Sequence, residues 1–295
     1  MAITTEHIKT LRERTGAGIL DCKKALEATD GDIENAINWL REKGIAKAAK
    51  KADRIAAEGL ASVALLGDVA VVCEINSETD FVAKNEKFVS LVKEVNEALV
   101  QAQAHNLETG LAAPLGEGTV ATALVAATST IGEKIELRRV AALRQSEGDI
   151  VGTYIHMGGK IATAVLLRHC QNEEVAHDVA MHVAASAPQY LNKAEIPASF
   201  IEQETNVQME AAKNDPKLAG KPAQALAKIV EGKMGKVLNE LSLADQAFIK
   251  NPDQTIAQYV KAHGGELGAF IRFVVGEGIQ KREDNFAEEV MSQVR

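Results

Sequence analysis

The sequence places Thr79-Asp80-Phe81-Val82-Ala83-Lys84-Asn85-Glu86 shortly after an apolar run, Val69-Ala70-Val71-Val72-Cys73. The pattern changes there from strand-type to helix-type, which predicts a strand-to-helix turn in an α+β fold. A buried Phe, or an Asp that caps a helix, would be routine at such a turn. The pair Asp80 and Phe81 instead puts an apolar wedge and a negative charge on one exposed tip, where function is often carried.

The composition is that of an ordinary globular protein of 295 residues, long enough for two or three domains. No apolar run approaches the roughly 18 residues that a membrane span needs, and the start lacks the pattern of a secretion signal. We therefore expect a cytoplasmic protein with no membrane partner. The formal net charge of -8 argues against direct nucleic-acid binding, which needs a basic face.

The first 54 residues predict three short helices with apolar positions three and four residues apart. We expect the first helix to end near Gly16, the second to be stopped by Gly31, and the third to begin at Asp32 and end before Gly44. Three helices joined by Gly-containing turns resemble a ubiquitin-associated-type domain. That resemblance implies a binding module.

The centre of the chain repeats one succession of elements. The first copy has strands at 59–66 and 69–75 around Gly67-Asp68, a strong hairpin signal, then a helix at 85–103 and a strand at 135–140. The second copy has strands at 149–155 and 160–167, a helix at 173–187 and a strand at 270–275. The repeat predicts a duplicated α+β core with antiparallel sheets.

The second copy contains an insertion with the pattern of two helices, at 198–215 and 224–241, about a Pro/Gly turn. Their apolar seams predict a projecting antiparallel helical hairpin of the coiled-coil type. Contact with another protein, including a homodimer, and an inert solvent face both fit this spacing. Near the end of the chain, Phe286, Val290 and Val294 form one apolar stripe that suits docking on the chain's own core or on a partner.

These patterns predict five segments. They are a three-helix unit at 1–54, a first half of the core at 55–143, a second half at 144–192 and 242–276, the inserted hairpin at 193–241 and a C-terminal helical module at 277–295.

We find no motif of enzyme chemistry. A nucleophile with a base, a metal cluster or a cofactor loop is missing at convincing spacing, so we expect no enzyme activity, no cofactor and no metal. The three residues Cys22, Cys73 and Cys170 are scattered, which favours reduced thiols. His156 lies in a predicted hairpin turn, where a turn residue without a role and a contact residue both fit.

Several motifs occur in an order that resembles the elongation factor Ts family of bacterial translation. They are Thr15-Gly16-Ala17-Gly18 through Ala25-Leu26, 79–84, Ile131-Gly132-Glu133, 138–143, Met181-His182-Val183-Ala184-Ala185, 270–273 and 275–279. The resemblance covers nearly the whole chain. It implies the fold described above and a guanine nucleotide exchange factor whose partner is the GTPase elongation factor Tu.

The resemblance also implies which residues touch that partner. Asp80 and Phe81, with Thr79 and Val82, would enter the GTPase domain near its magnesium site and release GDP. In the three-helix unit, the implied contact residues are Arg12, Ile19, Leu20 and Lys23. Weaker matches to family positions are Ile131, Gly132 and His156.

Two other functions are weighed against exchange. An adaptor that binds ubiquitin-like folds or nascent chains would use the three-helix unit but leaves the duplicated core unexplained. An enzyme with a site between the core halves would use Asp80 as a general acid or base, yet the sequence offers no partner base or nucleophile for it.

Overall fold

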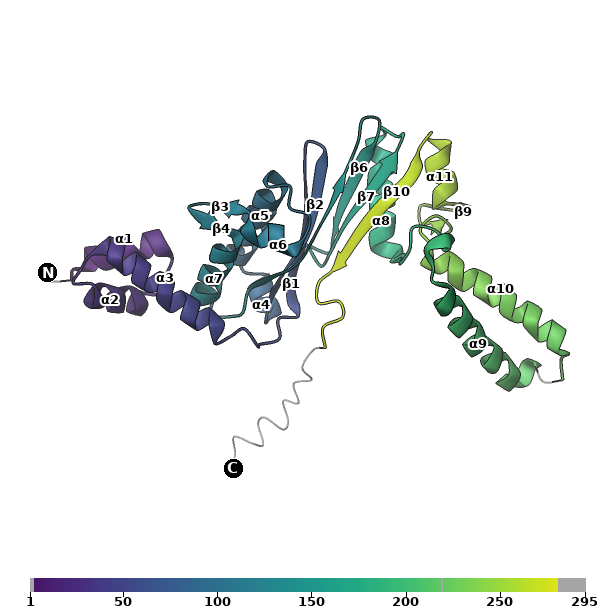
Figure 1. Cartoon of the computed structure of the whole chain (residues 1–295), viewed down its shortest axis with the longest axis horizontal. Helices are drawn as coiled ribbons and strands as arrows, with labels where there is room; N and C mark the ends of the chain where they lie inside the picture. Colours follow the sequence, from purple (N-terminus) through teal and green to yellow (C-terminus); the bar gives the residue numbers. More distant parts are fainter. Residues whose placement is uncertain (1–2, 219, 281–295) are drawn as a thin grey trace, which may run out of the picture.

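The structure is a computed structural model that describes residues 3–218 and 220–280. Three parts follow one another along an elongated molecule: a three-helix unit at one end, two sheets with their helices in the middle, and a helical hairpin at the other end (Figure 1). Helices and antiparallel sheets are both present, so the predicted α+β class is confirmed. The predicted terminal stripe at Phe286, Val290 and Val294 lies outside the described residues.

The N-terminal unit consists of α1 (Thr5–Thr15), α2 (Ile19–Ala28) and α3 (Ile33–Ala49). Thr4 caps α1 by accepting a hydrogen bond from the His7 backbone, and Gly16 ends it in the left-handed conformation at φ 65°. The apolar faces of the helices meet in a small core formed by Leu11, Cys22, Ala25, Leu26 and Ala36.

The prediction that the third helix ends before Gly44 is wrong, because α3 continues to Ala49. Gly44 is buried against α7 (Val120–Ile131), and a Cβ atom at this position would lie 3.5 Å from Cβ of Ser129. A glycine can end a helix or allow a second helix to approach closely. Here it does the latter.

The first sheet has the order β1-β2-β5, formed by β1 (Glu58–Leu66), β2 (Val69–Ser77) and β5 (Glu136–Arg144). Leu66 pairs with Val69, so Gly67 and Asp68 form a two-residue hairpin loop, as the sequence predicts. The central strand β2 is buried along its whole length.

Both faces of β2 are covered, which explains its continuous apolar run. Val71 and Cys73 face a core built with α5 (Glu86–Gln101), whereas Ala70 and Val72 face the second sheet. The short helix α4 (Asp80–Ala83) lies between β2 and α5. Between α5 and β5 the chain forms three short elements and then α7. The short elements are α6 (Leu107–Ala112), β3 (Pro114–Leu115) and β4 (Gly118–Thr119).

The second sheet has the order β6-β7-β10, formed by β6 (Ile150–His156), β7 (Ile161–Arg168) and β10 (Glu266–Val274), and it is covered by α8 (Glu173–Ser186). In each sheet the second strand is central and the third joins it after a helical segment. The two sheets pack face to face through small and branched side chains. These include Ala61 and Val72 from the first sheet, and Ala162, Ala164 and Leu166 from the second.

The insertion consists of α9 (Ala198–Asn214) and α10 (Ala223–Leu241), which pack along each other away from the sheets (Figure 1). Their seam is centred on Ala212, Val230 and Met234. Further short elements were not predicted. They are η1 (Lys193–Glu195), η2 (Pro216–Leu218), β8 (Ala247–Phe248), β9 (Asn251–Thr255) and α11 (Ile256–Ala262).

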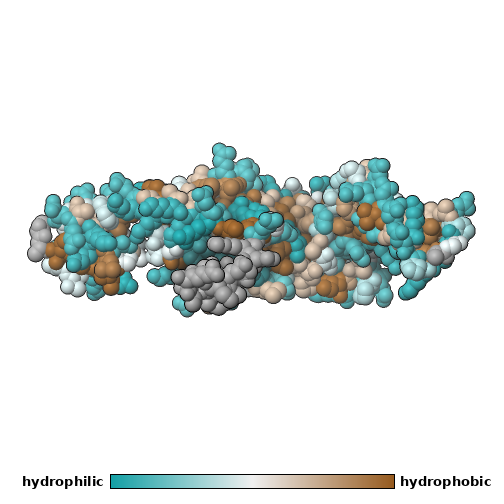
Figure 2. All heavy atoms as spheres, turned by 90° about the horizontal axis from the view of Figure 1, so that it is seen from below, coloured by the Kyte–Doolittle hydropathy of each residue, from teal (hydrophilic) through white to brown (hydrophobic). Residues whose placement is uncertain are grey.

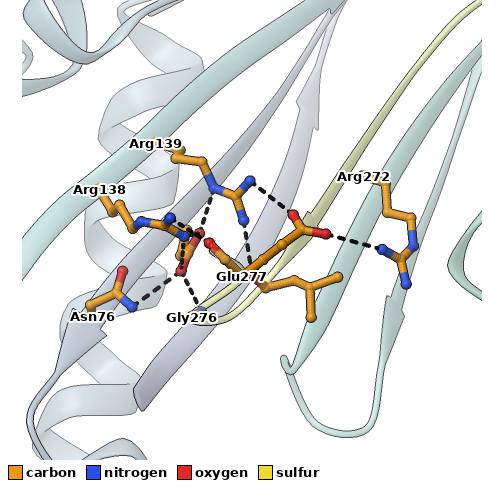
Figure 3. Close-up of polar contacts among 8 residues, drawn as sticks. Asn76, Arg138, Arg139, Arg272, Gly276 and Glu277 are labelled. Atoms are coloured by element: carbon orange, nitrogen blue, oxygen red, sulfur yellow. Dashed lines mark hydrogen bonds and ion pairs between the residues drawn. The ribbon is translucent and has the colours of Figure 1, made fainter. Parts of the chain in front are cut away.

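A buried carboxylate joins the two sheets at the end of β10. Glu74 has no exposed surface and binds Arg138 at 3.0 Å and Arg139 at 2.6 Å. Arg139 also forms an ion pair with Glu277 at 3.2 Å (Figure 3). Its guanidinium lies 4.3 Å from the centre of the Phe273 ring. Because a buried charge is tolerated only when it is paired and hydrogen-bonded, this network fixes how the two halves meet.

Candidate functional site

The predicted strand-to-helix turn is present as the short helix α4, which directly follows β2. Thr79 is its N-cap, in an extended conformation at φ -123°, and its hydroxyl accepts a hydrogen bond from the Val82 backbone at 3.3 Å. This bond satisfies one of the free amides at the start of the helix. The local sequence therefore determines the orientation of the first turn, in which Phe81 lies.

Phe81 points into solvent while its neighbours are held by the core. Its side chain is 82% exposed, whereas Ala83 is buried and Val82 is half-buried against the core of the first sheet. A large aromatic side chain is rarely left in water without a partner. The site thus presents an apolar ring on an anchored base.

Asp80 adds a negative charge beside that ring. Its carboxylate lies 2.7 Å from Nζ of Lys84, one helical turn away. The hydrogen bond from Lys84 lowers the pKa of Asp80, and the same bond raises the pKa of Lys84. Asp80 is therefore ionised at neutral pH.

The loop after α7 lies against this turn. Ile131 ends α7 and packs on the core, and Gly132 caps the helix in the left-handed conformation at φ 92°. The next residue, Glu133, accepts a hydrogen bond from the Thr79 hydroxyl at 2.6 Å. We did not predict a role for Glu133, because nothing in the spacing of the sequence links it to a residue 54 positions earlier.

His156 is the last residue of β6 and is half-buried, not fully exposed as a turn residue would be. Its Nδ1 lies 3.2 Å from the Tyr154 hydroxyl. The next residue, Met157, occupies the turn with φ 49° and is 72% exposed, and we did not single it out from the sequence. The hairpin loop after His156 contacts β1: the Gly159 carbonyl accepts a hydrogen bond from the Ala61 backbone N–H at 2.7 Å, and Lys160 lies 2.9 Å from the Glu58 carboxylate.

The second group of predicted contact residues lies on the three-helix unit. Arg12 is exposed on α1, and Ile19, Leu20 and Lys23 are exposed on the first turns of α2. Leu20 is 72% and Ile19 55% exposed, so they form an apolar surface flanked by charges. Seen from below, the molecule shows hydrophobic patches on this unit and elsewhere, separated by polar surface (Figure 2).

The two groups lie on different parts of the molecule, with α7 between the three-helix unit and α4 (Figure 1). A groove of about 630 Å³ lies where α2 and α3 meet α7, and its lining includes Trp39 of α3 and Val125 of α7. A partner that touches both groups must therefore be a large surface and not a small molecule.

We searched residues 3–218 and 220–280 for a metal site and for a membrane-spanning helix and found neither. These residues contain no cluster of three or more His, Cys, Asp or Glu side chains that could hold a metal ion. Among the helices formed by the described part of the chain, none has the length and apolar character needed to cross a membrane.

Comparison with known families identifies the segment that carries α4. The family model described as elongation factor TS matches residues 78–277, which include α4, the loop after α7, all three strands of the second sheet and the helical hairpin. The match begins after the three-helix unit, so the predicted contact residues on α1 and α2 lie outside it. It spans more than half of the chain, and the chain therefore belongs to the elongation factor Ts family, whose members are nucleotide exchange factors for elongation factor Tu.

Proposed function

We propose that the chain releases GDP from elongation factor Tu by inserting α4 into the GTPase domain, without making or breaking a covalent bond. The observation that carries this proposal is Phe81, a large apolar ring that is 82% exposed on a helix anchored by Thr79 and Ala83. An aromatic ring held out from a rigid base loses little conformational entropy when it is buried in a partner. That is the property a wedge requires.

In this mechanism Phe81 enters the GTPase domain near the magnesium site and displaces the elements that hold the ion's water shell. Asp80, ionised and already at the tip, offers competing interactions to the groups around the ion. The magnesium ion is among the largest local charges in a nucleotide site, so its loss weakens the hold on the phosphates. GDP then leaves.

Thermodynamic reciprocity sets a condition on the factor. It must bind nucleotide-free elongation factor Tu more tightly than the GDP form, and GDP must weaken the binding of the factor by the same ratio. Burial of one side chain such as Phe81 contributes roughly 1.5–3 kcal/mol, and each tenfold gain in release rate needs about 1.4 kcal/mol. A large acceleration therefore needs several contacts that act together.

The remaining contacts come from the other candidate residues. The apolar surface of Ile19 and Leu20, with Arg12 and Lys23 beside it, would grip the GTPase domain. The loop at Ile131 and Gly132 and the hairpin at His156 would add contacts near α4. These surfaces lie on separate parts of the molecule, which suits a partner with several domains.

The chemistry of Asp80 argues against an enzyme mechanism. A general acid or base needs a pKa close to the working pH, and carboxylates reach that range when their pKa is raised. The hydrogen bond from Lys84 lowers the pKa of Asp80 instead. Asp80 in this proposal acts as a fixed negative charge.

The helical hairpin offers limited apolar surface for a homodimer. Its seam is used within the hairpin, where α9 and α10 pack on each other, and Val207 is a large hydrophobic side chain that remains 53% exposed. A dimer through this segment stays a prediction, which sizing of the purified chain by light scattering will test.

The experiment that tests the function measures GDP release directly. Elongation factor Tu loaded with fluorescent GDP is mixed in a stopped-flow instrument with the chain and an excess of unlabelled GDP. The release rate should rise with the concentration of the chain and reach a plateau, and sizing should detect a complex of the two proteins. A rate that stays at the spontaneous value at saturating concentration would refute the proposal.

A further inference from the structure

Glu133 holds the turn that precedes Phe81 through three hydrogen bonds. Its Oε2 accepts from the backbone N–H of Glu78 at 3.1 Å and of Thr79 at 3.0 Å, and its Oε1 accepts from the Thr79 hydroxyl at 2.6 Å. Hydrogen bonds to an ionised carboxylate are shorter and stronger than neutral ones. One side chain therefore fixes both backbone and side-chain atoms of the turn.

The two loops hold each other reciprocally. Glu78 accepts a hydrogen bond from the backbone N–H of Lys134 at 2.6 Å, in the loop that contains Glu133. Arg54, in the segment after α3, lies 3.3 Å from the Glu78 carboxylate, and Lys51 donates to the Gly132 carbonyl. The turn before α4, the loop after α7 and the end of the N-terminal unit are thus joined at one place.

The hydroxyl of Thr79 links Glu133 to the first turn of α4. It donates to Glu133 and at the same time accepts from the Val82 backbone, in the first turn of α4. The ring of Phe81 lies between these two points along the chain. A change at Glu133 therefore alters the orientation of Phe81 through Thr79, whose backbone N–H and hydroxyl both donate to Glu133.

We propose that Glu133 is a positioning residue for exchange: its carboxylate holds Thr79 and thereby fixes the direction in which Phe81 is presented. This inference rests on the proposed function, because it gives Glu133 a role only if Phe81 is the wedge. Preorganisation of this kind lowers the barrier without adding a contact to the partner. The expected signature is a lower maximal rate at nearly unchanged affinity.

The central test is a double-mutant cycle between Glu133→Gln and Phe81→Ala. Glutamine keeps the length of the side chain but sets an NH₂ group against the donors of the turn. We expect Glu133→Gln to lower the maximal rate of GDP release by about tenfold, the scale of a lost charged hydrogen bond, with little change in the half-saturating concentration. In the Phe81→Ala background the same change should cost almost nothing, because residues that act through each other are not additive.

Glu136→Gln is the matched control. Glu136 lies three positions further along, at the start of β5, is half-buried and pairs with Lys134 at 2.9 Å. This variant removes the same charge but none of the three hydrogen bonds that Glu133 accepts from Glu78 and Thr79, so its release rate should stay at the wild-type value. A fluorine label on the Phe81 ring should change its NMR signal in Glu133→Gln and not in Glu136→Gln.

Three outcomes would overturn the inference. One is a folded Glu133→Gln with a wild-type maximal rate. Another is an equal loss of rate with and without Phe81, since Glu133 would then act by another route. The third is an unchanged fluorine signal. If Glu133→Gln does not fold, Glu133→Asp serves the same cycle, because it keeps the charge and withdraws it by one methylene group.

Failure of the function itself looks different. In that case wild-type protein leaves the rate of GDP release at its spontaneous value, and no variant can lower it. If the wild-type chain accelerates GDP release and Glu133→Gln does so at the same maximal rate, only the positioning role is refuted.

Discussion

Gly276 donates its backbone N–H to the buried carboxylate of Glu74 at 2.8 Å, across 202 positions of the sequence. Glu74 belongs to the central strand of the first sheet, and Gly276 follows the last strand of the second. Gly276 has φ 75°, and a Cβ atom there would lie 2.3 Å from the Ala57 carbonyl oxygen, so only glycine fits. The end of the second sheet is therefore tied to the first at a defined point.

Removal of the Glu74 carboxylate should destabilise the core strongly. Glu74→Ala leaves Arg138 and Arg139 without their buried partner, and broken buried pairs typically cost about 3–5 kcal/mol. Urea unfolding followed by circular dichroism will measure this loss. The control is Glu136→Ala, which removes a half-exposed carboxylate on the adjacent strand, whose ion pair with Lys134 should contribute about 1 kcal/mol or less. Equal losses in the two variants would show that the network in Figure 3 does not hold the sheets together.

Truncation of the wedge should slow exchange and leave the fold intact. We expect Phe81→Ala to reduce the rate of GDP release by about tenfold or more, because the lost burial of the ring in the partner corresponds to roughly 1.5–3 kcal/mol. The side chain is 82% exposed in the free chain, so the melting temperature should not fall. Stopped-flow release of fluorescent GDP measures the effect.

Leu66→Ala is the control for that variant. Leu66 is also a large exposed side chain, at 54%, but it lies at the opposite end of β1 and β2 from α4. Its truncation should leave the release rate unchanged. A Phe81→Ala protein that exchanges at the wild-type rate would remove the ring from the mechanism.

A new charge on the three-helix unit should weaken the binding of elongation factor Tu without lowering the maximal rate of GDP release. Leu20→Asp places a carboxylate in an apolar surface, and the lost burial of the leucine predicts an increase of about tenfold or more in the half-saturating concentration. The maximal release rate at saturation should stay near the wild-type value. A titration of the release rate against factor concentration separates the two quantities, and an unchanged half-saturation would exclude Leu20 from the interface.

His182 should make the second half of the core sensitive to acid. Its Nε2 donates to Gln246 at 2.9 Å, and its Nδ1 accepts from the Ile249 backbone at 3.3 Å. Burial lowers the pKa of His182, although the hydrogen bond to Gln246 opposes this shift. A proton on Nδ1 would also meet the N–H of Ile249.

The sign of the pH effect follows from that lowered pKa. Below the ordinary histidine pKa of about 6.5, His182 is protonated in the unfolded chain but still neutral in the folded chain. The free energy of unfolding therefore falls as the pH falls, until the pH passes the lowered pKa of the folded state. Melting temperatures between pH 8 and pH 5 measure this loss. Part of it should vanish in His182→Gln and persist in the exposed control His177→Gln. An unchanged pH profile in His182→Gln would assign the acid sensitivity to other groups.

Features that depend on neighbouring residues could be predicted from the sequence. Gly67 and Asp68 set the turn between β1 and β2, and the pairing of Leu66 with Val69 follows. The same holds for the strand-to-helix turn at Thr79, because capping is a contact between residues three positions apart. The apolar seams of α9 and α10 can also be predicted from the sequence, because their helical spacing repeats over many turns.

The sequence-based prediction is wrong where one residue type can serve two structural purposes. Gly44 carries the signal of a helix end, yet it lies within α3, where the Ser129 side chain of α7 packs against it. Similarly, His156 was placed in a turn, but pairing with Ile161 makes it the end of a strand. Which use applies depends on the element that packs against the residue.

The hydrogen-bond networks around Glu133 and Glu74 could not be predicted from local sequence patterns. Glu133 meets the backbone of Glu78 at a separation of 55 positions, and Glu74 meets Gly276 at 202. A carboxylate looks the same in the sequence whether it is solvated or buried, and its energy depends on the donors that the folded chain brings to it. Spacing and alternation are properties of the chain itself, whereas the donors around Glu74 and Glu133 exist only once distant segments have packed.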